Sequence, residues 1–154
     1  MSFDPIRVQH LGALKDRLSR AQIITPDLVS DVIDGACLRL AQHPAAAARV
    51  HRLIDSAAFV DVALAVIELE LPAWKLRRLC HDHGEWHCSL SKQLALPAEL
   101  DAMAEAGHEI LPVAILSAFV EARRVASAAS EFRPKIVPQV RPAHGLVACC
   151  DNFR

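Results

Sequence analysis

The chain has 154 residues, 53% hydrophobic and 23% charged, which is typical of one globular domain with its own core. Its 17 basic and 18 acidic side chains leave a formal net charge of −1, which argues against nucleic acid or an anionic membrane surface as a partner. With 5 glycines, no tyrosine and 5% aromatic residues, the composition favours helices over a sandwich of many short strands.

The cysteines and the N-terminal residues predict a cytoplasmic protein. An odd number of cysteines without a framework spacing indicates reduced thiols. Charged side chains recur through the first twenty residues, so no apolar signal-peptide core is expected. The most apolar run, residues 57–71, is interrupted by Asp61, Glu68 and Glu70 and is too short to span a bilayer. We therefore expect no membrane partner.

Helices are expected throughout the first half of the chain. Asp4-Pro5 is a cap-and-proline start, and the narrow apolar stripe that follows indicates a peripheral helix. Thr25-Pro26 starts a second helix, which we expect to end at His43-Pro44. Pro44 then opens a short helix with Val50, Leu53 and Ile54 on its inner side.

Residues 57–70 are expected to form a helix in the middle of the domain, because apolar side chains go nearly all the way round it. The local alternation over 62–71 leaves a strand as the alternative.

The segment from Trp74 to about Ser91 predicts a β-hairpin, because two runs flank His83-Gly84. In that register Asp82 pairs with Glu85, and Cys80 pairs with His87. One face then carries Leu79, His81, Trp86, Cys88 and Leu90, and the other carries Arg78, Cys80, Asp82, Glu85, His87 and Ser89. The first face is the more apolar, so we expect it to be buried, and we expect one histidine to be half-buried.

Two further helices are expected after the hairpin. Leu96-Pro97 begins one that Gly107 terminates, and a last long helix starts near His108-Glu109 with Pro112 in its first turn. The prolines at 134, 138 and 142 predict an extended, flexible tail over 128–154. The fold class is therefore mainly α: a compact helical domain at 1–127, of five to six helices, with one inserted β-hairpin at about 74–91.

The decapeptide LCHDHGEWHC, residues 79–88, holds most of the reactive side chains. Our main interpretation is a solvated hairpin without a cofactor. The alternative is a metal- or redox-sensing site, with zinc held by Cys80, His87 and either Asp82 or Glu85. This site would need further ligands, because the predicted register sends Cys80 and Cys88 to opposite faces and no C-x₂-C spacing is present. Nucleophilic chemistry at Cys80 would lack a water-excluding pocket.

Two other groups of side chains allow more than one interpretation. Lys75, Arg77 and Arg78 beside Trp74 could bind phosphate, as in a nucleic-acid-binding regulator, or could keep an edge strand soluble; the near-neutral chain favours the second interpretation. The pair Cys149-Cys150 could be reactive thiols or an incidental pair, and nothing in the sequence decides between them.

The block from Leu53 to Arg124 resembles small bacterial proteins to which no activity is assigned. The stretches that carry this resemblance are LIDSAAFVDVALAVIELELPAWKLRR, GEWHCSLS and AILSAFVEARR. It implies no catalytic or binding residue. Because the hairpin has no evident sheet partner in the sequence, its strand edges favour a non-enzymatic protein that acts through protein–protein contacts. The partner would be an unknown protein or a second copy of the chain, as in a homodimer.

Overall fold

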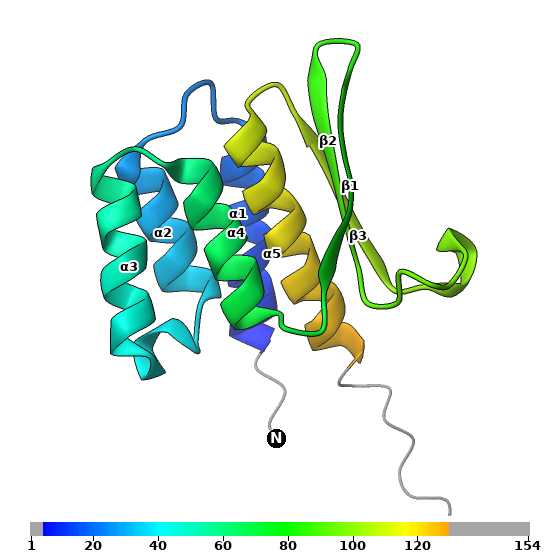
Figure 1. Ribbon diagram of the computed structural model, residues 1–154, viewed down its shortest axis with the longest axis horizontal. Helices are drawn as coiled ribbons and strands as arrows, with labels where there is room; N and C mark the ends of the chain where they lie inside the picture. The colour runs from blue at the N-terminus through cyan, green and yellow to red at the C-terminus, as the bar shows by residue number, and fades with distance from the viewer. Residues whose placement is uncertain (1–4, 130–154) are drawn as a thin grey trace, which may run out of the picture.

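The structure, a computed structural model, describes residues 5–129 (Figure 1). The helices in this range are α1 (Pro5–Ser19), α2 (Pro26–Ala36), α3 (Pro44–Asp55), α4 (Phe59–Glu70) and α5 (Leu111–Ala129), with short 3₁₀ turns η1 (Leu40–Gln42) and η2 (Ala98–Leu100). The strands are β1 (Lys75–Asp82), β2 (Glu85–Ser91) and β3 (Met103–His108). The described part is therefore mainly α, and the predicted number of helices is confirmed. The predicted flexible tail lies almost entirely outside the described residues.

Helix α5 is the centre of the molecule. It lies between the sheet on one side and helices α1 and α4 on the other (Figure 1). Eight consecutive residues, 113–120, are buried, because neighbours cover the helix all round. The predicted start near Glu109, with Pro112 in the first turn, is confirmed: the Nδ1 atom of His108 accepts the Ile110 amide at 3.0 Å, just before the helix begins.

Helix α1 is not peripheral, which corrects the expectation from its narrow stripe. Leu11, Leu14 and Leu18 are all buried, and α1 packs against both α5 and α2. A stripe of three leucines is narrow, but leucines three and four residues apart lie on one face and can all reach a central helix.

Helix α2 begins as predicted but ends earlier than predicted. The Thr25 hydroxyl accepts the Leu28 amide at 3.2 Å, which makes Thr25 the N-cap, with Pro26 at the first helical position. The helix ends at Ala36 rather than at His43. The cause is Glu70 at the end of α4, whose carboxylate accepts the amides of Leu38, Arg39 and Leu40 at 3.0, 2.7 and 2.9 Å. In a continued helix those amides would bond to carbonyls one turn earlier.

Helices α3 and α4 agree with the sequence. Val50 and Ile54 of α3 are buried. Residues 59–70 are helical, so the strand alternative for 62–71 is wrong, and Val62, Ala63, Val66 and Ile67 all lie in the core.

The predicted hairpin is present, but it belongs to a three-stranded antiparallel sheet of order β1-β2-β3. The helix expected from Leu96 to Gly107 is wrong: the chain makes only the turn η2 and then strand β3. Ala104 and Ala106 of β3 face α5, and their small side chains allow the helix to approach the sheet closely. Alanine favours helices, but in β3 the alanines lie in a strand, where they pack against the helix. Within residues 5–129, no helix is long and apolar enough to cross a membrane.

Candidate functional site

The hairpin has the register predicted from its turn. His83 and Gly84 both have positive φ, 51° and 87°, as a two-residue hairpin loop requires. Asp82 faces Glu85, Cys80 faces His87, and Leu79 faces Cys88. An irregularity between Leu76 and Arg78 places Arg77 as an extra residue in β1.

The face of the sheet that was expected to be buried is buried in β2 but not in β1. Cys88 and Leu90 are buried beneath α5. Leu79 lies on the same face, yet its side chain is 37% exposed, because β1 is the strand farthest from the helix. The expectation of one half-buried histidine in the hairpin is wrong, because His81, His83 and His87 are all exposed. His81 instead contacts Trp86, with ring centroids 4.9 Å apart.

The opposite face of the sheet is open and hollowed into a recess of about 490 Å³. We call it the open-face recess. Across its three strands run two rows of residues, Cys80–His87–Gly107 and Arg78–Ser89–Glu105. Asp82, toward the turn, and Cys88 and Ala106 also line it.

Gly107 leaves space for the His87 side chain. A Cβ atom at Gly107 would lie 3.1 Å from His87 Nδ1, so the imidazole leans over β3, away from β1 and Cys80. Glu85 also lies near Gly107, with its Oε2 atom 3.5 Å from the same Cβ position. The sequence did not reveal this contact, because Gly107 was expected to end a helix.

The residues of the zinc alternative share a face but form no ready metal site. Cys80, Asp82 and His87 line the open-face recess, whereas the Cys88 side chain packs in the core. Over residues 5–129, no group of three or more His, Cys, Asp or Glu side chains is placed to hold a metal ion. Burial raises the pKa of Cys88 to about 11, which makes it a poor thiolate donor. Cys149 and Cys150 lie outside the described residues.

The basic residues of β1 have different surroundings. The Arg77 guanidinium bonds to the Leu96 carbonyl at 3.1 Å and to Asp101 at 3.3 Å, so it fastens the loop between β2 and β3. Trp74 is buried, with the Lys92 ammonium over its ring at 5.5 Å from the centroid. Arg77 is thus engaged within the chain, and the buried Trp74 does not offer its ring as a stacking platform for a base.

Asp101 is the centre of that loop. Its carboxylate accepts the Ser91 hydroxyl, the Gln93 amide at 3.0 Å and the Arg77 guanidinium. The hydrogen bond from Ser91, together with the Gln93 amide and the charge of Arg77, lowers the pKa of Asp101 below its ordinary value.

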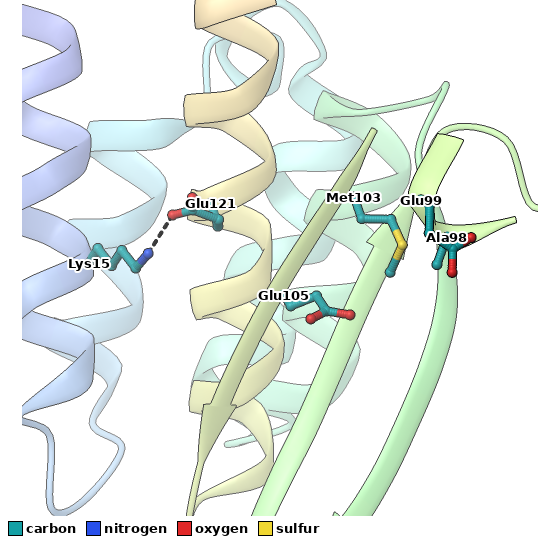
Figure 2. A pocket seen from close by; sticks show the side chains of 6 residues that line it. All are labelled: Lys15, Ala98, Glu99, Met103, Glu105 and Glu121. Carbon is teal, nitrogen blue, oxygen red and sulfur yellow. Dashed lines mark hydrogen bonds and ion pairs between the residues drawn. The ribbon is translucent and has the colours of Figure 1, made fainter. Parts of the chain in front are cut away.

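A second recess lies beside β3, between the sheet and α1. Figure 2 shows the Lys15–Glu121 ion pair on one side of it and Glu99 and Met103 on the other. Burial raises the pKa of Glu121, but the hydrogen bonds and charges of Lys15 and Arg124 together lower it by more, so the net shift is downward. The remaining carboxylates, Glu99 and Glu105, make the β3 side of the sheet acidic.

Like β3 at the other end, β1 is an edge strand of the sheet that residues 5–129 form. Strand order places β1 at the end of the sheet, and no strand among residues 5–129 pairs with its outer edge. Leu76 and Leu79, on the side that faces α5, are 41% and 37% exposed. In Figure 1 the tip of the hairpin, where β1 ends and β2 begins, extends past the start of α5.

No family model matches the chain, and comparisons with curated proteins and with solved structures found no match. The resemblance of residues 53–124 to small bacterial proteins thus stays an expectation.

Proposed function

We propose that this protein acts through protein–protein contacts, without catalysis, and that a second copy of the chain pairs with the outer edge of β1. The observation that carries the proposal is the eight-residue strand β1, which has one edge unpaired within residues 5–129 and exposed leucines beside that edge. Unpaired edges of this length readily accept another strand.

The side chains of β1 support pairing rather than a merely solubilised edge. Charges protect an edge when they point freely into solvent. Lys75, Arg78 and Asp82 are exposed charges on β1, but Arg77 is tied to Asp101 and Leu96. Leu76 and Leu79 present apolar surface on the side facing α5. A partner strand would cover these leucines and extend the apolar layer beneath the sheet.

Charge complementarity supports a second copy as the occupant. The regular part of β1 carries both a cation, Arg78, and an anion, Asp82, so two antiparallel copies can place opposite charges together. Such an interface is small and belongs to the weak, transient class, so we expect a dissociation constant in the micromolar range.

Sedimentation velocity from low micromolar to near-millimolar concentration tests the proposal. The wild type should shift from monomer to dimer across this range. Leu79→Gln should weaken the dimer about tenfold, because it removes apolar contact at the edge. Leu64→Gln is the matched control, because Leu64 on α4 is exposed to almost the same degree (36%) but lies away from the sheet. A wild type that is monomeric at every concentration refutes the proposed function.

A further inference from the structure

The regular part of β1, Arg78 to Asp82, can pair with itself in one favourable register. This inference rests on the proposed function and adds the geometry of the contact. Residues that face each other in an antiparallel pair point to the same side of the sheet. Arg78, Cys80 and Asp82 point to the open face, and Leu79 and His81 to the face of α5. A twofold axis that keeps both faces continuous must therefore pass beside one residue, not between two.

The charges and the bulge of β1 then decide at which of the five residues the twofold axis can pass. An axis at Arg78 or at Asp82 would set like charges opposite each other, which is destabilising. An axis at Leu79 would draw the extra residue Arg77 of both copies into the paired stretch. An axis at His81 would run the pairing into the turn at His83-Gly84.

An axis at Cys80 avoids all of these conflicts. Arg78 of each copy then faces Asp82 of the other, so the interface gains two opposite-charge pairs on the open face. Leu79 faces His81 of the other copy, beside the His81–Trp86 ring contact. The bulge at Arg77 stays outside the paired residues.

The backbone fits the same axis. A two-residue turn makes Asp82–Glu85 the hydrogen-bonded pair next to it, and the ladder alternates from there. Cys80 therefore turns its amide and carbonyl toward β2, whereas Leu79 and His81 turn theirs to the outer edge. Pairing Leu79 with His81 of the other copy, twice, satisfies these outward groups. Cys80 then faces its counterpart in a non-hydrogen-bonded pair, where Cα atoms are about 4.5 Å apart.

We propose that two copies of the chain pair β1 with β1 in antiparallel orientation about an axis at Cys80, which makes one continuous six-stranded sheet. The Arg78–Asp82 pairs set the register, and the two Cys80 thiols lie side by side on the open face.

A charge exchange tests the register. Arg78→Asp alone, or Asp82→Arg alone, replaces two attractive pairs with two repulsive ones and should raise the dissociation constant about tenfold. The double variant Arg78→Asp/Asp82→Arg should restore the affinity of the wild type, because the pairs are re-formed with exchanged signs. Lys75→Asp is the control: it makes the same change of charge on β1 but outside the paired stretch, and it should have a smaller effect.

Disulfide trapping tests the axis. The experiment uses Cys149→Ser/Cys150→Ser protein, so that thiols outside the described residues do not contribute. Copper phenanthroline with dioxygen takes two electrons and two protons from a pair of facing thiols and leaves one disulfide, for which a Cα separation of 4.4–6.8 Å is typical. Most of the protein should become a covalent dimer, and Cys80→Ser should abolish it. Adding Leu79→Cys to Cys80→Ser should not restore the cross-link.

The outcomes separate the two proposals. A monomer at every concentration refutes both. A dimer in which Cys80 does not cross-link, or in which the double exchange fails to restore affinity, refutes the register but leaves self-association standing. Larger assemblies would mean head-to-tail pairing of β1 with the acidic β3 side and would also overturn the proposed axis.

Discussion

At the scale of single residues, Glu70 connects helix α4 to the segment that follows α2. The residue is 4% exposed, and its two carboxylate oxygens receive three consecutive amides from the segment after α2. The Arg123 guanidinium lies 3.9 Å away and balances its charge. This arrangement ends α2, starts η1 and joins both to α4. Burying a carboxylate is costly unless donors surround it, and here the backbone supplies them.

Glu70→Gln should therefore lower the free energy of unfolding by about 3 kcal/mol. The amide of glutamine offers one acceptor oxygen and turns donors toward amides that are themselves donors. Urea unfolding followed by circular dichroism measures the loss. Glu68→Gln, on the exposed side of the same helix, should change the stability by less than about 0.5 kcal/mol. Equal effects at the two positions would contradict the role assigned to Glu70.

The lowered pKa of Asp101 predicts that the stability of the protein depends on pH. Its folded pKa is lowered, chiefly by the Ser91 hydroxyl, so its contribution is complete above the ordinary carboxyl value of about 3.9 and is lost as pH falls through the lowered pKa. Between about pH 5 and pH 2, the urea midpoint of the wild type should fall more steeply than that of Asp101→Asn. Glu99→Gln, an exposed residue of the same loop, should keep the slope of the wild type. Parallel slopes for wild type and Asp101→Asn would refute this account.

At the scale of elements, local signals were sufficient wherever one residue type dictates the backbone. His83-Gly84 fixed the hairpin register, and Thr25-Pro26 fixed the start of α2. The misses have a common cause, because each was decided by a residue distant in the sequence. Glu70 ends α2 from 30 residues away, and α5 selects a strand for Met103–His108. The contact of His87 with Gly107 in the open-face recess followed from the same missed strand.

The strand assignment of β3 makes a direct prediction. Ala104 is buried beneath α5, whereas its neighbour Glu105 points to the open face. Ala104→Leu should destabilise the protein by about 1–3 kcal/mol, because the added volume would push α5 from the sheet. Glu105→Leu should stay within about 0.5 kcal/mol in thermal or urea unfolding. The large difference between adjacent residues follows from strand alternation, which sends Ala104 and Glu105 to opposite faces of the sheet. The helix expected from the sequence has no such alternation.

At the scale of the whole molecule, the fold is asymmetric: helices cover one face of the sheet (Figure 1), and α5 packs against β3 and β2, whereas β1 lies at the edge of the sheet. The sheet gains most of its stability where α5 covers β2 and β3, so β1 depends on β2 alone. A strand held on one side can accept another partner without losing any contact it already has. The self-pairing proposed above would use the backbone groups that the fold leaves outward.

Amide hydrogen exchange at residue resolution measures whether the outward backbone groups of β1 are paired. In the monomer the Leu79 and His81 amides point to the outer edge and should exchange fast, whereas the Cys80 amide is bonded to β2 and should be protected. Raising the concentration through the dimer transition should slow exchange at Leu79 and His81 and leave Cys80 unchanged. In Arg78→Asp protein the two amides should stay fast at the same concentration. Protection at Leu79 and His81 that is independent of concentration would mean that β1 is covered by its own chain, and the edge would not be available to a second copy.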